Sequence, residues 1–318
     1  MKRTFVLLSL FAVFFAACEK EQEETALSNN VYHPTQDPAI VTEEGVEQGS
    51  IVGLFSVSDT LRVRFSRGNL QYRAKDSKWR FAGNQFDVVG KENENIGKAF
   101  SGWIDLFGWG TSGNANSMPY CSEMDPSLYA TSVNMLVGNS YDWGVSNEIS
   151  NAEVSWIWRT LTVDEWNYLL EGRSNASQLK SYATVMGHQG LLLLPDEWIC
   201  PANVSVVPSA QSYSKNNYDK SAWIYLQSNG AVFLPATGWR MGTTVQYPEE
   251  GYYWTAVGGG SEMAMYLSFR SGRNVTLTFG QRYLGCGLRL VAIEPAYAQT
   301  KLDGDAAAQV EGWLALEL

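Results

Sequence analysis

The chain has 318 residues, with 33 acidic and 23 basic side chains and a formal net charge of -10. Nucleic-acid binding depends on clustered lysine and arginine, so this charge argues against a nucleic-acid partner and against attachment to anionic lipid by charge. A chain of this length can bury a sizeable core, as one large domain or two small ones.

The first residues are typical of an export signal. Lys2 and Arg3 precede an apolar run over residues 5–17 that is too short to span a bilayer as a helix. Small residues stand directly before Cys18, and the segment resembles a bacterial lipoprotein signal. This resemblance implies that residues 1–17 are removed and that Cys18 carries lipid, which anchors the protein by apolar burial of the acyl chains. An ordinary secretory signal with an incidental cysteine is the alternative.

Residues 18–50 form an acidic tether. The segment begins with the charged run 19–24, is polar throughout and contains Pro34 and Pro38. Such composition rarely folds, so we expect a flexible spacer. The acidic run also resembles the export signal of Bacteroidetes surface lipoproteins, which implies a lipid anchor in the outer membrane and exposure at the cell surface.

The folded domain is expected over residues 51–295, and it begins with short strands. Apolar or alternating runs predict strands at 51–57, 61–66, 69–73 and 78–81, with a turn at 74–77. From 101 to 151, glycine, asparagine and serine alternate with aromatic residues, which is typical of ordered loops pinned by their rings. The aromatic residues of this segment are Trp103, Phe107, Trp109, Tyr120, Tyr129, Tyr141 and Trp143.

Two helices are predicted in the second half. Thr162 and Glu165 have the spacing of a capping box, and Gly172 is a suitable stop. A shorter helix is expected at 220–228, capped by Asp219. Strands are expected at 191–194, 231–234, 252–255, 264–269, 275–279 and 287–293. The tail, 296–318, fits either a weak amphipathic helix or a loose segment.

Cysteine and histidine usage gives no metal signal. With Cys18 lipidated, three cysteines remain, Cys121, Cys200 and Cys286, which allows one disulfide and a free thiol or three buried unpaired thiols. There is no Cys-x-x-Cys, and the two histidines are His33, in the tether, and His188, expected in a turn between strands. We therefore predict no metal site and no cofactor.

Several segments carry a resemblance to a known family. Residues 159–170 resemble the helix start R-L-P-T-x-x-E-W-E-Y-A of the formylglycine-generating-enzyme-like branch of the C-type-lectin-like fold. The wider chain is more similar to the Fibrobacter major paralogous domain proteins. The matching pieces are Phe65–Tyr72, Ser101–Gly113, Tyr141–Gly144, Gly230–Gly238, Gly251–Thr255 and Gly287–Val291. The resemblance implies an α+β, C-type-lectin-like fold: two helices on small antiparallel sheets with long aromatic-rich loops.

The resemblance does not carry an activity over. The enzymes of that branch need two cysteines near the C-terminal strands, and only Cys286 lies there. The calcium-binding motifs of sugar-binding lectins, E-P-N or Q-P-D with W-N-D, are absent from the sequence. We therefore expect no catalytic residues and a protein that is not an enzyme.

The leading hypothesis is a surface-anchored binding or adhesion lipoprotein. Aromatic faces can stack on sugar rings while polar side chains hydrogen-bond the rim, and loops on a rigid scaffold commonly carry binding residues. We expect a glycan or protein ligand at the C-terminal loops, although most of the 12 tryptophans are expected to serve the core. The candidate residues are Trp239, Arg240, Tyr247, Tyr252, Tyr253, Trp254, Arg270, Arg273, Asn274 and Arg282.

Three alternatives stay open. The first is a structural or partner subunit of an outer-membrane or fibre assembly, with the same loops used for protein contact. The second is a hypervariable receptor whose variable stretch would be residues 252–291. The third is an enzyme acting on surface polysaccharide, but Asp164–Glu165 fits a first helical turn and Glu249–Glu250 fits a turn after Pro248. Neither pair provides two carboxylates facing each other across a cleft.

Overall fold

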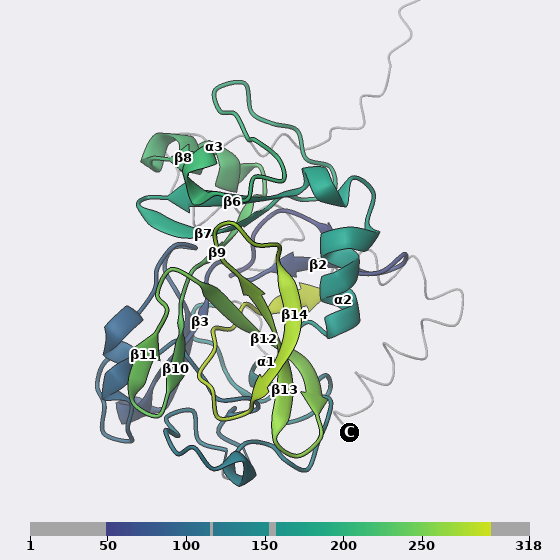
Figure 1. Ribbon diagram of the computed structural model, residues 1–318. Helices are drawn as coiled ribbons and strands as arrows, with labels where there is room; N and C mark the ends of the chain where they lie inside the picture. Colours follow the sequence, from purple (N-terminus) through teal and green to yellow (C-terminus); the bar gives the residue numbers. More distant parts are fainter. Residues whose placement is uncertain (1–48, 115–116, 153–156, 294–318) are drawn as a thin grey trace, which may run out of the picture.

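The computed structural model of the chain describes residues 49–114, 117–152 and 157–293. The predicted signal, Cys18, nearly all of the tether and the tail lie outside these ranges. Short helices and small sheets are mixed along the described chain (Figure 1), so the predicted α+β class is confirmed. No helix in the described ranges is long and apolar enough to cross a membrane.

The two ends of the described chain meet in one sheet. Its strands, all antiparallel to their neighbours, follow the order β1 (Phe55–Ser56), β2 (Arg62–Phe65), β15 (Val291–Ile293) and β5 (Trp158–Arg159). Val63, Phe65 and Val291 are fully buried in one core cluster. The last strand therefore lies between β2 and β5, and the sheet depends on residues from both ends.

The first predicted helix has the expected N-terminal cap. α2 (Val163–Asn167) continues into a π-helical turn at Tyr168–Gly172. The Thr162 hydroxyl accepts from the backbone N–H of Glu165 at 3.2 Å, and the Glu165 carboxylate accepts from the N–H of Thr162 at 2.8 Å. This capping box is confirmed. The Arg159 guanidinium also donates twice to Glu165, which ties the helix start to β5.

A second four-stranded sheet lies beneath the second predicted helix (Figure 1). Its order is β8 (Asn217–Tyr218), β6 (Lys180–Val185), β7 (His188–Leu193) and β9 (Val232–Pro235), with β6 and β8 parallel and the other pairs antiparallel. α3 (Lys220–Ser228) is capped by Asp219, whose carboxylate accepts from the N–H of Ala222 at 2.9 Å. Trp223 of this helix packs edge-on against Phe233 of β9.

The remaining strands form a three-stranded sheet and two hairpins. The sheet has the order β12 (Gly251–Gly259), β13 (Met263–Phe269) and β14 (Thr276–Gln281). The hairpins are β3 (Leu70–Arg73) with β4 (Lys78–Phe81), and β10 (Trp239–Met241) with β11 (Thr244–Gln246). Short helices complete the described chain: α1 (Trp143–Ser146) and 3-10 helices at Ala74–Asp76, Gly90–Asn95, Pro126–Leu128, Ala176–Gln178 and Tyr213–Lys215.

The aromatic loops of residues 101–151 are attached to the body as predicted. Trp109 and Tyr129 are fully buried, and the indole N–H of Trp109 donates to the backbone oxygen of Thr255 at 2.9 Å. The Arg282 guanidinium lies over the Trp109 ring and donates to the backbone oxygens of Tyr129, Ala130 and Val133. Contacts from Thr255 in β12 and from Arg282 after β14 thus fix the loop to the three-stranded sheet.

Some predicted details are wrong. Of the strand expected at 51–57 only Phe55–Ser56 is a regular strand, and of 287–293 only Val291–Ile293. The other residues make isolated backbone contacts: Gly287 bridges Tyr253, and Ile51, Leu288 and Leu290 are buried and hydrogen-bond through their backbones. His188 begins β7 and stacks on Phe86, whereas the turn is made by Met186 and Gly187, both with positive φ.

Neither prediction for the cysteines is correct. Cys121, Cys200 and Cys286 are all unpaired, so no disulfide links them. Only Cys286 is buried, while Cys200 is exposed and Cys121 is half-buried, so the alternative of three buried thiols is also wrong.

Candidate functional site

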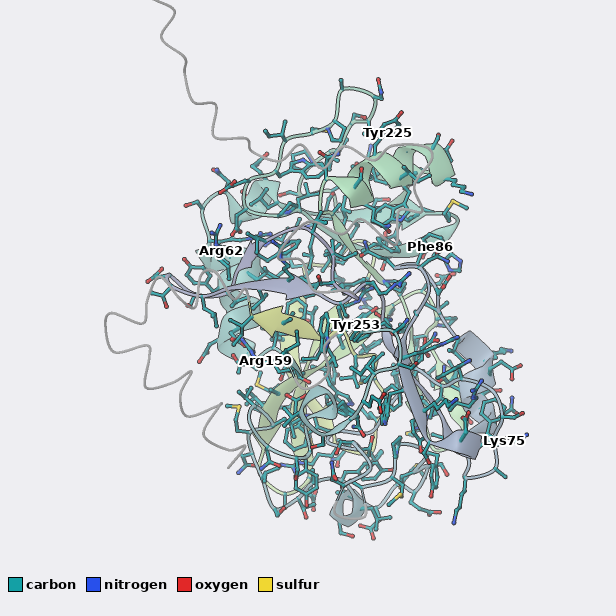
Figure 2. The ribbon with its side chains drawn as sticks, turned by 180° about the vertical axis from the view of Figure 1, so that it is seen from behind. Arg62, Lys75, Phe86, Arg159, Tyr225 and Tyr253 are labelled. Atoms are coloured by element: carbon teal, nitrogen blue, oxygen red, sulfur yellow. The ribbon has the colours of Figure 1, made fainter. Side chains whose placement is uncertain are left out.

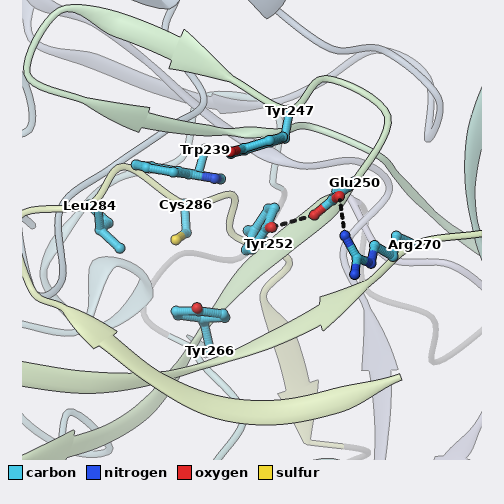
Figure 3. A pocket seen from close by; sticks show the side chains of 8 residues that line it. All are labelled: Trp239, Tyr247, Glu250, Tyr252, Tyr266, Arg270, Leu284 and Cys286. Atoms are coloured by element: carbon cyan, nitrogen blue, oxygen red, sulfur yellow. Dashed lines mark hydrogen bonds and ion pairs between the residues drawn. The ribbon is translucent and has the colours of Figure 1, made fainter. Parts of the chain in front are cut away.

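A pocket of about 340 Å³ opens between the β10–β11 hairpin and the β12–β13–β14 sheet (Figure 3). Trp239 and Tyr247 lie on one side and Tyr266 on the other, with the polar residues Glu250 and Arg270 at one end (Figure 3). The full lining is Trp239, Tyr247, Glu250, Tyr252, Tyr266, Arg270, Leu284 and Cys286. Its volume lies at the lower end of the roughly 300–1,000 Å³ usual for ligand pockets, so it suits a small unit.

The aromatic rings form a continuous series around this pocket. Trp239 stacks on Tyr247 with ring centroids 5.9 Å apart and meets Tyr252 edge-on at 6.4 Å. Tyr252 in turn meets Tyr266 edge-on at 5.5 Å, and Tyr266 meets Trp254 at 5.8 Å. Such edge-on contacts are favourable and hold each ring in one orientation. The aromatic wall is therefore prearranged.

Strand alternation decides which residues of β12 reach the pocket. Side chains of a strand point to opposite faces in turn, so Tyr252 and Trp254 share one face and Tyr253 takes the other. Tyr252 lines the pocket, and Trp254 lies beneath it against Tyr266. Tyr253 instead stacks on Phe269 in another core cluster.

Strand register brings the two charged residues together. Gly251 pairs with Phe269 at the end of the β12–β13 ladder, so the next residues outward, Glu250 and Arg270, lie opposite each other. Gly251 is required there, because an added Cβ would lie 2.0 Å from the Phe269 ring. Arg270 Nη1 donates to Glu250 Oε1 at 3.1 Å. This cross-strand ion pair closes one end of the pocket.

The Glu250 carboxylate is held from a second side by Tyr252. The Tyr252 hydroxyl donates to Oε2, the oxygen that Arg270 does not use. Burial, and secondarily the bond to Glu250, raises the pKa of the Tyr252 phenol above its ordinary value of 10.0. The phenol therefore stays protonated at neutral pH and acts as a donor to the carboxylate.

The floor of the pocket is apolar. Leu284 and Cys286 complete it, and Cys286 is fully buried, with its backbone paired to Phe107. Burial raises the pKa of the Cys286 thiol well above the ordinary 9.0, so the thiol stays neutral. Cys286 therefore contributes a neutral, apolar surface to the floor.

The entrance is formed by Tyr247, which follows the β10–β11 hairpin. Its side chain is 55% exposed, and its backbone has a φ of 47°, in the left-handed region. A non-glycine residue in this conformation is uncommon and is maintained by its surroundings. Tyr247 therefore presents its ring to solvent beside the half-buried Trp239.

The structure brings four of the ten predicted ligand residues together in the pocket: Trp239, Tyr247, Tyr252 and Arg270. Four others, Arg240, Tyr253, Trp254 and Arg282, are almost fully buried and bind other parts of the protein. Tyr253, near the centre of the molecule in Figure 2, accepts from Asn69 and donates to the backbone of Pro235. The indole of Trp254 donates to the backbone oxygen of Phe107 at 2.7 Å.

The buried arginines serve the fold. Arg240 donates to the backbone oxygens of Leu106, Cys121 and Gly242, as Arg282 does to the aromatic loop. The last two predicted residues, Arg273 and Asn274, are exposed between β13 and β14 and do not line the pocket. Asn274 accepts from the Gln211 side chain there at 2.6 Å.

Sequence reasoning missed four lining residues as ligand contacts: Glu250, Tyr266, Leu284 and Cys286. Glu250 lies in the predicted turn after Pro248, where the sequence indicates only an acidic pair with Glu249. The signal for Tyr266 was its alternation within the predicted strand 264–269. Nothing local indicates Leu284 or Cys286, because they reach the floor through chain segments distant in sequence.

The described residues contain no cluster of three histidine, cysteine or acidic side chains that could hold a metal ion. No family model, no curated protein and no solved structure matches this chain.

Proposed function

We propose that this protein is a surface-anchored, glycan-binding lipoprotein and that the aromatic pocket is its binding site. The observation that carries the proposal is the aromatic series of Tyr247, Trp239 and Tyr252 beside the polar pair Glu250–Arg270. A sugar ring has apolar faces and a polar rim, and this pocket offers an aromatic wall and charged donors and acceptors at one end.

The lining favours binding over hydrolysis. Glycoside hydrolysis with two carboxylates needs them across a cleft, roughly 5–9.5 Å apart. Glu250 is the single carboxylate among the lining residues, and Tyr252 and Arg270 already engage both of its oxygens. We therefore propose recognition without catalysis, a role that suits adhesion or capture at the surface.

The location and the fold belong to the same proposal. The sequence of residues 1–24 supports lipidation at Cys18 and exposure on the outer membrane. The two helices at their predicted places and the small antiparallel sheets support a C-type-lectin-like fold of the Fibrobacter major paralogous domain type. The anchor is tested by metabolic labelling with a clickable fatty acid. Labelling of the wild type and its loss in Cys18→Ala would support the anchor, and equal labelling would contradict it.

Glycan binding is tested with the soluble chain from residue 19, screened on a glycan array and then titrated with the best hit. Tyr247→Ala removes an exposed ring from the entrance, so we expect affinity to fall about tenfold, close to 1.4 kcal/mol. Phe279→Ala is the matched control: Phe279 is 50% exposed on β14 and does not line the pocket. It should bind like the wild type.

Two results would contradict the proposal. If folded protein gives no hits on the array, a protein ligand or a role as a structural subunit of a surface assembly would be favoured instead. A hit that Tyr247→Ala and Phe279→Ala weaken equally would place glycan binding outside this pocket.

A further inference from the structure

The charged end of the pocket has one group with open hydrogen-bonding positions. The Arg270 side chain is 51% exposed, and its ion pair with Glu250 uses only Nη1. A guanidinium has five N–H donors in a fixed plane, so the edge formed by Nε and Nη2 remains. Within the described residues, no protein acceptor occupies that edge.

The carboxylate beside it is already satisfied. Glu250 is 19% exposed in its side chain and accepts from Tyr252 on one oxygen and from Arg270 on the other. A ligand ammonium group would have to displace one of these donors. The same contacts hold Arg270 in place, so little side-chain entropy is lost when a ligand binds it.

We propose that the pocket selects a sugar unit that carries a carboxylate, a uronic or sialic acid, and that Arg270 binds this carboxylate. The proposal rests on the glycan-binding function above. The planar Nε–Nη2 edge matches a carboxylate with two parallel hydrogen bonds, the geometry that makes such pairs strong and specific. Glu250 is the positioning residue behind Arg270, and the sugar ring lies along Trp239 and Tyr252.

The remainder of the lining is consistent with this orientation. Leu284, Cys286 and Tyr266 form the apolar side, away from the ion pair (Figure 3). An acidic sugar has its charge at one end of an otherwise uncharged ring. Its carboxylate therefore fits the end of the pocket that holds Arg270, and its uncharged part fits the apolar side.

The test compares sugars that differ only in the acid. The soluble chain from residue 19 is titrated with the methyl glycosides of glucuronic and galacturonic acid and of glucose and galactose, and with sialic acid and acetate. We expect at least one acidic sugar to bind about tenfold or more tightly than its neutral partner. The affinity for this acidic sugar should fall as salt is added, because salt screens the contact between the two charges. Acetate at equal concentration should not displace the sugar.

Two arginine variants assign the effect. Arg270→Gln should abolish the difference in affinity between the acidic sugar and its neutral partner. Arg273→Gln is the matched control, because Arg273 is also exposed and lies outside the lining. It should leave both affinities unchanged.

The outcomes separate this inference from the function on which it rests. Neutral sugars that bind as tightly as acidic ones would overturn the selectivity and leave glycan binding intact. A preference that survives in Arg270→Gln would overturn the role of Arg270. Displacement of the sugar by acetate alone would show a simple anion site and overturn the proposal. If no sugar binds, both the glycan-binding function and the selectivity for acidic sugars are contradicted.

Discussion

Three arginines of the core, Arg240, Arg282 and Arg289, have their charge satisfied by oxygens of backbone and amide groups. Arg289 donates to the backbone of Ser66, Gln85 and Phe233 and to the Asn69 side chain. Burial lowers the pKa of both Arg282 and Arg289 to about 10, which leaves them charged at neutral pH. These residues act as multivalent links between loops.

Arg282→Lys should destabilise the protein by about 3 kcal/mol or more. The lysine amine has three donors and cannot reach the carbonyl groups that the guanidinium joins, and each buried acceptor left without a partner costs about 1–3 kcal/mol. Urea unfolding measures the effect. Arg273→Lys, at an exposed position, should stay within about 0.5 kcal/mol of the wild type. Equal stability of the two variants would contradict the structural role of Arg282.

Two buried carboxylates should make the protein more stable in mild acid. Burial raises the pKa of Asp105 and of Asp142 from 3.8 to about 6. Between these values the native state binds more protons than the unfolded state, so unfolding free energy rises as pH falls from 7 to 5. We expect about 1 kcal/mol from each group over this range.

The contribution of Asp105 is isolated with Asp105→Asn. The asparagine oxygen can still accept from one of the two donors, Val89 and Asn93, but its NH2 group faces the other, so stability falls by an amount that does not depend on pH. Urea unfolding at pH 7 and pH 5 should therefore show a larger gain for the wild type than for the variant. Parallel changes in both proteins would show that Asp105 does not titrate in this range.

At the scale of elements, the start of α2 combines a cap with a buried ion pair. Thr162→Ala removes the hydroxyl of the capping box and should cost about 1 kcal/mol. Glu165→Ala removes the other half and also leaves the Arg159 guanidinium, 5% exposed, without its carboxylate. That loss should reach about 3–5 kcal/mol. Thermal or urea unfolding that ranks the variants in the reverse order would contradict this account.

Elements with local signals are the ones that sequence predicts well. Both helix caps are predicted from the residues at the helix starts, and the strands near Leu191 and Phe233 are predicted from short apolar runs. Residues 252–254 are three aromatic residues in a row, so the sequence does not show which of them face the core. Tyr252 and Tyr253 are therefore both predicted ligand residues, whereas of the two only Tyr252 lines the pocket.

The rest of the site depends on contacts that have no local signal. Glu250 and Arg270 meet through strand register, a property of two segments and their turn. Arg240 is one of the predicted ligand residues but is fully buried, which is rare for an arginine. Its partners are backbone oxygens, which every residue has, so no pattern of side chains predicts its burial.

At the scale of the molecule, the fold depends on a three-residue strand. β15 joins β2 to β5, and its Val291 is fully buried. A chain that ends after Arg289 should lose the connection between these strands and fail to unfold cooperatively, whereas one that ends after Ile293 retains the strand. Thermal unfolding followed by circular dichroism compares the two. A cooperative transition in the shorter chain would show that β15 is dispensable.

The position of β15 also sets an order of events during biosynthesis. β2 emerges from the ribosome early, but its central partner emerges only after nearly all of the described chain has been made. Pairings between such distant segments form slowly and leave strand edges exposed in the meantime. If the chain is exported as we propose, this sheet cannot close while the chain is still being synthesised, so transfer across the membrane can begin before the native state forms.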